Sequence, residues 1–336
     1  MRKGQNPAKF VKDVPRPERI TAALLNYIPF LSGFYTETLD VLKVCMESMR
    51  KEAGLSFDLM VFDNGSCPQV RDFLVKEKEE GRIQYLILAE KNMGKGGAWN
   101  VMLAGAPGEI IAYTDSDVLF SPNWLSRSVE ILETFPNVGM VTARPFRTPP
   151  EFFESTLKWA GANAKLEEGQ FIPWERFLEF NLSLGQTEEE NKKVYTETRD
   201  WRITYTPSLR GRSPKQSHAE SDKTIVAFAG ASHWQFTAYK STLQQFLPFD
   251  MDKPMGQVRQ LDKRMNDAGL LRLMVSDPLA MNMSNTLGYL RGELGKESGK
   301  VKSKKVTSLA RSVLELGPVK KMLLATYNKI FNWYYS

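Results

Sequence analysis

Two aspartates, Asp115 and Asp117, close the apolar run from Ile110 to Tyr113 in the stretch EIIAYTDSDVLF. A carboxylate at the end of a buried strand is costly unless a metal ion, a cationic side chain or water pairs with it. Magnesium and manganese prefer oxygen ligands and use one or two carboxylates together with phosphate and water. An isolated Asp-x-Asp is more often a solvated turn than a metal site, so the neighbouring motifs decide between the two interpretations.

Two other motifs place polar residues at the ends of predicted strands. Asp63 and Asn64 follow the apolar stretch LMVF, and the segment NMGKGG at 92–97 follows RIQYLILAE. The glycines of this segment allow the backbone to approach a phosphate closely, and the helix that begins there offers free amide groups. Lys95 lies in the same loop and could contact the phosphate, although exposed lysines are ordinary on any surface. The loop lacks the Gly-Lys-Ser/Thr sequence of a nucleotide-triphosphate loop.

A framework of strands and helices must bring these motifs together, and the hydrophobic pattern predicts one. Strands alternate with helices over the first half of the chain. The predicted strands are 19–28, 57–66, 82–90, 109–117 and 138–145, and the predicted helices are 34–54, 67–81, 96–106 and 122–135. This alternation predicts a mostly parallel, buried sheet with right-handed crossovers. Because ligands gather at the carboxyl ends of parallel strands, we expect all three motifs to meet at one edge of the sheet.

The pattern changes after residue 149. Segments 150–169 and 174–195 have helical spacing, and the polar segment 206–223 is predicted to be a mobile loop. A strand followed by a helix is predicted for 224–246, and a loop, a helix ended by a glycine and a final strand for 248–278.

Four blocks of the chain resemble the inverting nucleotide-sugar glycosyltransferases of family 2, which have the GT-A fold. In chain order they are NYIPFLSGFYTETLDVLKVCMESM, LMVFDNGSCPQV, NMGKGGAWN and GEIIAYTDSDVLFSPNWL. The likeness is close over about residues 18–145 and loose over 225–290, and Asn64 stands where the family has a second Asp. The resemblance implies an α/β, Rossmann-like GT-A fold: a mostly parallel sheet with helices on both faces, plus a helical insertion and C-terminal helices.

The resemblance also implies a division of the chain. We expect a flexible N-terminal segment at 1–17 and a catalytic domain at 18–290, followed by a helical tail. Within the catalytic domain, the expected parts are a nucleotide-sugar-binding half at 18–148, a helical and loop insertion at 149–224 and an acceptor-side half at 225–290.

In the donor half, the last acid of the Asp-x-Asp motif corresponds to the direct metal ligand of the family, and Asp63 to a residue that holds the base or ribose. The expected nucleotide-sugar-binding residues are Pro29, Asp63, Asn92, Gly94, Lys95, Asp115, Ser116 and Asp117. A nucleotide diphosphate departs with developing negative charge, so Mn²⁺ or Mg²⁺ on its phosphates lowers the barrier. The expected metal ligands are Asp115, Asp117 and Asn282.

The acceptor half departs from the family pattern. The acidic pair that normally supplies the base falls at Gln257 and Val258. Asp262, Asp252 and Asp250 remain as candidates for deprotonating an acceptor hydroxyl, and Asp262 ranks first. The alternative is that Asp262 only caps a helix or forms an ion pair. With Asp117 on the metal, the predicted catalytic residues are thus Asp262, Asp252 and Asp117.

Two further positions bear on metal and acceptor. Relatives often complete the metal site with a His, but the corresponding segment LAMNMSN has none, and Asn282 offers only a weaker oxygen ligand. His233 and Trp234 follow an apolar strand and are expected on the acceptor side, because an aromatic face suits the CH groups of a sugar. A satisfied core histidine is the competing interpretation of His233.

The formal net charge of +6 is concentrated at the end of the chain. Segment 291–336 holds ten Lys or Arg against three Glu, so the preceding residues carry about −1, and no nucleic-acid-binding module is present. This basic amphipathic tail is predicted to be helical, either packing on the catalytic domain or contacting an anionic membrane. No signal peptide or membrane span is recognisable, so we expect a cytoplasmic protein, with the tail able to place it peripherally at the inner face of the membrane.

The expected reaction is the metal-assisted transfer of a sugar from a UDP-, GDP- or dTDP-linked donor to a glycan or lipid-linked acceptor, in polysaccharide, glycolipid or cell-envelope glycan synthesis. Two alternatives stay open. A catalytically silent sugar-nucleotide-binding or scaffold protein would explain the missing acidic pair and His. A sugar-phosphate nucleotidyltransferase would need a Gly-rich, Arg-Lys signature after the first strand, and NYIPFLSGFY has none.

Overall fold

The computed structural model describes residues 4–207, 224–251 and 258–293. The chain divides into two compact units, Met1–Leu294 and Gly295–Ser336, and all described residues belong to the first. The predicted loop at 206–223 and the predicted tail helices therefore lie almost entirely outside the described residues.

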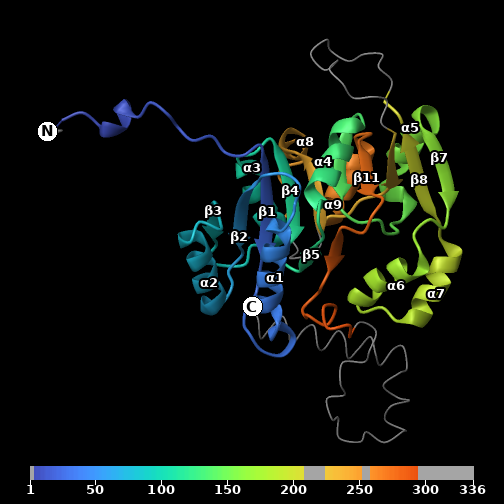
Figure 1. Ribbon diagram of the computed structural model, residues 1–336, viewed down its shortest axis with the longest axis horizontal. Coiled ribbons are helices and arrows are strands. Elements are labelled where there is room, and N and C mark those ends of the chain that lie inside the picture. The colour runs from blue at the N-terminus through green and yellow to red at the C-terminus, as the bar shows by residue number, and fades with distance from the viewer. Residues whose placement is uncertain (1–3, 208–223, 252–257, 294–336) are drawn as a thin grey trace, which may run out of the picture. The chain divides into compact units, whose positions relative to one another are not determined.

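The first half of the sheet consists of four parallel strands in the order β3-β2-β1-β4 (Figure 1). They are β1 (Ile20–Asn26), β2 (Asp58–Asp63), β3 (Tyr85–Leu88) and β4 (Ile110–Asp115). All seven residues of β1 are buried, because helices cover both faces of the sheet. Leu24 lies in one hydrophobic core with Leu42, and the next residue, Leu25, lies in a second core with Trp99. This alternation is the period of two that a strand buried on both faces requires.

The second half continues the same sheet through β10-β6-β11-β9-β8-β7. These strands are β6 (Val138–Thr142), β7 (Lys165–Gly169), β8 (Asp200–Tyr205), β9 (Ile225–Ala229), β10 (Gln235–Tyr239) and β11 (Leu271–Val275). Within the described part of the chain, β10, β9 and β7 run opposite to the other seven strands of this ten-stranded sheet. The predicted α/β class with a mostly parallel sheet is confirmed.

The helices connect these strands and cover the sheet (Figure 1). They are α1 (Thr38–Arg50), α2 (Pro68–Glu79), α3 (Gly94–Gly105), α4 (Trp124–Thr134), α5 (Glu154–Asn163), α6 (Trp174–Ser183), α7 (Glu188–Glu197), α8 (Lys240–Gln244) and α9 (Val258–Asp267), with 3-10 turns at Pro7–Phe10, Gly33–Tyr35 and Pro150–Phe152. The predicted helix 174–195 is two helices, because Gly185 adopts a left-handed φ of 80° and Thr187 begins α7 with a capping box.

Two further predictions for the second half were wrong in detail. The predicted helix 150–169 ends at Asn163, and its last residues form β7, where Leu166 pairs with the fully buried Ile203 of β8. The segment 224–246 contains two strands, β9 and β10, before the short helix α8. In both places long-range pairing decides the structure, because β-propensity depends on the neighbouring strand more than on the local sequence.

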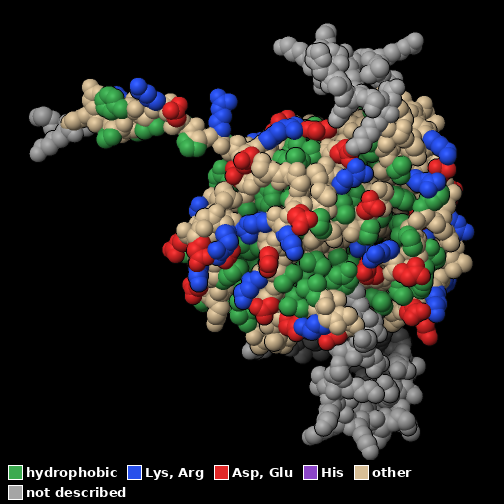
Figure 2. All heavy atoms as spheres, viewed as in Figure 1, with side chains coloured by type: hydrophobic (Ala, Val, Ile, Leu, Met, Phe, Trp, Pro, Cys, Tyr) green, Lys and Arg blue, Asp and Glu red, His purple; other side chains and the backbone are tan. Residues whose placement is uncertain are grey.

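Basic and acidic side chains are mixed on the surface, as the near-zero net charge before the tail predicts. Lys and Arg side chains are interspersed with Asp and Glu on the face displayed in Figure 2, without a single basic field. Within the described residues, no helix is long and apolar enough to cross a membrane.

Candidate functional site

The Asp-x-Asp motif lies where β4 ends and a second, two-stranded sheet begins. Asp115 is the last residue of β4, and after Ser116 and Asp117 the chain forms β5 (Val118–Phe120). β5 pairs antiparallel with β12 (Ala280–Asn282), in a register that places Val118 opposite Asn282. The amide of Asn282 consequently donates to Asp117 Oδ2 over 3.3 Å, across 165 residues of sequence.

Asp115 is paired with cationic and phenolic groups of the protein itself. Lys95 Nζ lies 2.7 and 2.8 Å from the two carboxylate oxygens, and Tyr113 donates its hydroxyl to Oδ1 over 2.5 Å. The Lys95 side chain is only 9% exposed, and its ammonium lies 5.4 Å from the ring centre of Trp99. As placed here, Lys95 neutralises Asp115; its predicted contact with a donor phosphate stays a prediction.

Asp117 is the acid in this motif that has no cationic partner in the described part of the chain. Its Oδ1 is buried and has no hydrogen-bond partner among the described residues. Burial and the negative charge of Asp115 raise the pKa of Asp117 to about 7, against the opposing effects of Lys95 and Asn282. A buried carboxylate that is short of positive charge is a favourable position for a cation.

The residues at this edge fit a divalent metal that takes most of its ligands from substrate phosphates and water. No group of three or more His, Cys, Asp or Glu side chains is arranged around a metal position in the described ranges. Mg²⁺ often uses only one or two carboxylates together with substrate phosphates and water, and Asp117 Oδ1 could serve as such a carboxylate ligand. Asn282 turns its amide nitrogen toward Asp117, and its oxygen accepts from Ser284 N, so its predicted role as a ligand would require the amide to turn.

Asp63 holds the turn after β2. Its side chain has no exposed surface: Oδ1 accepts from Asn26 over 2.9 Å and Oδ2 from the backbone of Ser66 over 3.0 Å. Ser66 in turn accepts from the backbone of Ile28, just before the half-buried Pro29. In this arrangement the carboxylate positions the loops after β1 and β2, and its predicted contact with base or ribose has no exposed atom to use.

Asn92 and Gly94 tie the start of α3 to the end of β2. The Asn92 oxygen accepts from the side chain of Asn64 over 2.9 Å and from Gly94 N over 2.8 Å, and Asn64 accepts from Met93 N. Gly94 has a left-handed φ of 72°, which favours glycine. The sequence placed Asn64 at this edge and noted it as a departure from the family pattern, and the structure makes it the centre of this network.

His233 and Trp234 form the turn before β10, beside the end of β4. Asp115 N donates to Trp234 O over 2.9 Å, so the turn adjoins the Asp-x-Asp motif. His233 Nδ1 lies 3.0 Å from Asp262 Oδ2. The Trp234 ring is half-buried and packs near Phe146 and Phe180, at centroid distances of 6.3 and 5.8 Å.

The candidate bases have different environments. Asp262 is buried and accepts from Arg272 over 2.6 Å. It therefore forms the ion pair that the sequence analysis gave as the alternative to a role as base. Asp250 is exposed and accepts from Gln260 over 2.6 Å. Asp252 lies outside the described residues. Arg272 belongs to no motif in the sequence, although an arginine in the apolar strand LLRLMV is a signal that a buried acid lies nearby.

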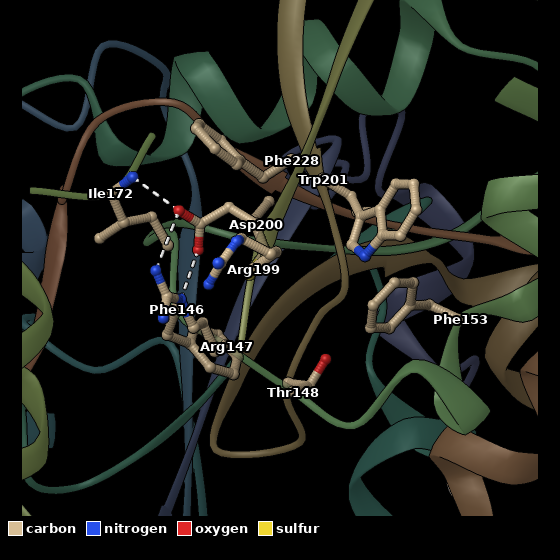
Figure 3. Close-up of a pocket in the computed structure, with 11 residues that line it drawn as sticks. Phe146, Arg147, Thr148, Phe153, Ile172, Arg199, Asp200, Trp201 and Phe228 are labelled. Carbon is tan, nitrogen blue, oxygen red and sulfur yellow. Dashed lines mark hydrogen bonds and ion pairs between the residues drawn. The ribbon is translucent and has the colours of Figure 1, made fainter. Parts of the chain in front are cut away.

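A small cavity elsewhere in the fold is not a substrate site. It encloses about 10 Å³ beside Arg147 and Asp200, which is room for about one water. Figure 3 shows the Asp200 carboxylate between the Arg147 guanidinium, 2.7 Å away, and the backbone of Ile172. This buried pair joins the segment after β6 to the start of β8, and the cavity is too small for a sugar.

Comparison with known proteins gives the following similarities. The family model described as Glycosyl transferase family 2 matches residues 33–202. An uncharacterized glycosyltransferase of Nostoc sp. (strain PCC 7120) is 29% identical over 96 residues, which are 29% of this chain and 30% of that protein.

Two solved structures are similar at low identity. The crystal structure of GalNAc-T7 with UDP, GalNAc and Mn²⁺ is 8% identical with a TM-score of 0.44, covering 79% of this chain and 44% of the other. A mannosyltransferase from Pyrobaculum calidifontis in complex with GDP-Man and Mn²⁺ is 17% identical with a TM-score of 0.39, covering 79% of this chain and 55% of the other. The chain thus spans between about a third and just over half of the length of these proteins.

Proposed function

This chain belongs to glycosyl transferase family 2, and from that membership and its site we propose that it transfers a sugar from a nucleotide-diphosphate sugar to an acceptor hydroxyl, with inversion at the anomeric carbon and with the assistance of a divalent metal. The donor lies across Asn92, Lys95 and the Asp-x-Asp motif at the carboxyl ends of the parallel strands.

One observation carries the metal-assisted part of this proposal. Asp117 Oδ1 is a buried carboxylate oxygen without a partner among the described residues, at the strand edge where three polar loops meet. Mn²⁺ or Mg²⁺ bound there, with Asp115 close by, would supply the positive charge that a departing diphosphate needs.

The protein's own groups perform the remaining tasks. The first amides of α3 after Gly94 offer backbone N–H groups to the phosphates, because the first turn of a helix leaves its donors unpaired. The Gly94 amide itself donates to Asn92. Lys95 holds Asp115 and keeps a cation within the donor site. The glycine at position 96 allows α3 to approach the loop that precedes α9, since a Cβ there would lie 2.6 Å from Asp250 O.

The test is titration calorimetry with UDP, GDP and dTDP, each with Mn²⁺, with Mg²⁺ and with chelator. We expect at least one nucleotide to bind more tightly with metal, and Asp117→Asn to abolish that difference. Asp72→Asn, which removes the same charge from an exposed position on α2, is the matched control and should behave as wild type. If no nucleotide shows metal-dependent affinity, the proposal of metal-assisted transfer fails.

A catalytically silent sugar-nucleotide-binding or scaffold protein is the second candidate. Its support is the replacement of the family's acidic pair by Gln257 and Val258, together with Asn282 in place of a His. Binding of a sugar nucleotide without hydrolysis or transfer to any acceptor would favour this candidate. The nucleotidyltransferase alternative has no supporting residue in the β1 loop.

The acceptor we propose is a glycan or a lipid-linked glycan, in polysaccharide, glycolipid or cell-envelope synthesis. The basic tail at 291–336 would hold the enzyme peripherally at an anionic inner membrane surface, where such an acceptor is found. This part of the chain lies almost entirely outside the described residues, and the membrane contact stays a proposal drawn from its sequence.

A further inference from the structure

We propose that His233 is the general base that deprotonates the acceptor hydroxyl, and that Asp262 and Arg272 are positioning residues behind it. This inference rests on the proposed function and names the group that replaces the family's missing acidic pair.

The three side chains form a relay that runs from the interior toward solvent. Arg272, on β11, is 1% exposed and donates to Asp262 Oδ1 over 2.6 Å. Asp262, on α9, is 7% exposed and faces His233 Nδ1 with its other oxygen at 3.0 Å. Because the ion pair with Arg272 keeps Asp262 an acceptor, Nδ1 carries the imidazole proton and Nε2 carries the lone pair.

Exposure decides which member of the relay meets the acceptor. The His233 side chain is 28% exposed, four times the fraction for Asp262, and its Nε2 has no hydrogen-bond partner among the described residues. Both Asp262 oxygens are already engaged, one by Arg272 and one by His233. A general base needs a lone pair within hydrogen-bond reach of the proton. Asp262 keeps lone pairs on both oxygens, but it is buried behind His233, so the imidazole is the member of this cluster that an acceptor can reach.

The turn that carries His233 lies beside the donor site. Asp115 N donates to the carbonyl of Trp234, the residue after His233, over 2.9 Å. On the other side of the sheet edge, the segment before α9 contacts the glycines of the donor loop: a Cβ at Gly97 would lie 2.9 Å from the Met251 methyl. The base and the donor are therefore presented at the same edge, from neighbouring strands.

The turn is also held in place by the end of β6. Ser232 N donates to Thr142 Oγ1 over 2.9 Å, and that hydroxyl donates to Gln235 O over 3.0 Å. The Gln235 side chain accepts from Ala143 N over 2.7 Å. A backbone fixed at both ends of a two-residue turn pre-organises the imidazole, as a catalytic group requires.

The step balances without any further reactant. The acceptor oxygen forms a bond to the anomeric carbon while the bond from that carbon to the donor's phosphate oxygen breaks. The hydroxyl proton moves to His233 Nε2, and the nucleotide diphosphate leaves with the bonding electron pair. Asp262 stabilises the imidazolium that results, and Arg272 keeps Asp262 in place.

The experiment uses the full-length chain and the donor that calorimetry identifies, with water or a sugar as the acceptor. The variants are His233→Gln, His233→Ala, Asp262→Asn and, as the matched control, Asp267→Asn, which changes an exposed acid on the same helix. Measured quantities are kcat, donor affinity, melting temperature, and the rate of the His233→Ala variant with added imidazole.

We expect His233→Gln to lower kcat by about 100-fold or more, the usual range for general base catalysis, with donor affinity unchanged. Imidazole should restore part of the rate to His233→Ala, and Asp262→Asn should lower kcat as well, because Asn holds the wrong imidazole tautomer and does not stabilise the imidazolium. Asp267→Asn should match wild type. Rescue by imidazole separates a chemical role of His233 from a structural one, since imidazole restores no lost packing.

A wild-type rate in His233→Gln, or no imidazole rescue of His233→Ala, overturns the assignment. A large loss in Asp262→Asn with none in His233→Gln would make Asp262 the base and overturn it equally. These results leave donor binding and turnover by the wild type intact, so the proposed function survives. A wild-type chain that binds no sugar nucleotide, or binds one without turnover, refutes both.

Discussion

Replacing Arg272 by Met is expected to destabilise the protein by about 4 kcal/mol, because it leaves the buried carboxylate of Asp262 without its cationic partner. Met has a similar length and keeps the packing of β11, but it cannot donate to Asp262, Ala231 O or Phe152 O, which lie 2.6, 2.7 and 2.5 Å from the guanidinium. Breaking one side of a buried ion pair typically costs about 3 to 5 kcal/mol. An unpaired buried carbonyl costs about 1 to 3 kcal/mol, and the retained contact of Asp262 with His233 offsets part of that loss.

The assay is reversible denaturation with urea, supported by thermal melting. A loss of about 4 kcal/mol corresponds to a fall of roughly 10 °C in the melting temperature of a domain of this size. Adding Asp262→Asn to Arg272→Met removes the stranded charge, so the double variant should be more stable than Arg272→Met alone. The coupling between the two positions should reach about 2 kcal/mol.

Two results would refute this reasoning. The first is an Arg272→Met variant whose free energy of unfolding lies within about 1 kcal/mol of wild type. That would mean that the attraction within the ion pair only balances the cost of burying the two charges. The second is strict additivity of the two substitutions, which would mean that Arg272 and Asp262 do not act on one another. Asp267→Asn, exposed on the same helix, should change stability by no more than about 0.5 kcal/mol.

Three further outcomes are expected. Gly96→Ala should lower both the melting temperature and the donor affinity. The added Cβ would lie 2.6 Å from Asp250 O and would push α3 away from the loop before α9. Unchanged values in both measurements would contradict this contact. Hydrogen bonds from Thr286 and from the backbone amide of Leu287 lower the pKa of Glu37 to about 2, below its ordinary value. Ionised Glu37 therefore stabilises the fold above its unfolded pKa, and this contribution is lost as the pH falls from about 5 to about 2. Urea denaturation of wild type and Glu37→Gln at pH 7 and pH 3 should show a stability gap that narrows at the lower pH, and a constant gap would exclude the linkage. Deletion of residues 301–336 should release the protein from anionic vesicles in a flotation assay; vesicle binding that persists would place the membrane contact elsewhere.

The first half of the fold could be predicted from the sequence because its signals are local. The buried strand at Ile20–Asn26 is an apolar run interrupted by Thr21 and ended by Asn26, and α1 shows helical spacing with a basic last turn. The glycine-rich start of α3 and the acids at the end of β4 are short motifs with fixed spacing. Alternation of such segments restricts the topology to a parallel sheet, and the parallel sheet places their ends at one edge.

Partners distant in sequence could not be predicted in the same way. Asn282 was expected near Asp117 only from the family resemblance, because their contact depends on the pairing of β5 with β12, two strands of three residues that carry no periodic signal of their own. Lys95 belongs to a loop that suits phosphate, yet its ammonium lies on Asp115. Asp63 matches a binding motif, and the structure buries it under Asn26 and Ser66.

By itself the sequence determined the class of fold, the edge at which the three polar motifs gather, and the absence of the family's acidic pair before α9. Only the tertiary structure decided that His233, Asp262 and Arg272 contact one another, because they come from a turn, a helix and a strand that are distant in sequence. Hydrophobic periodicity specifies which face of each element is buried. The partner of a buried charge is instead fixed by packing, and no local pattern records which arginine or histidine will lie within 3 Å of a given acid.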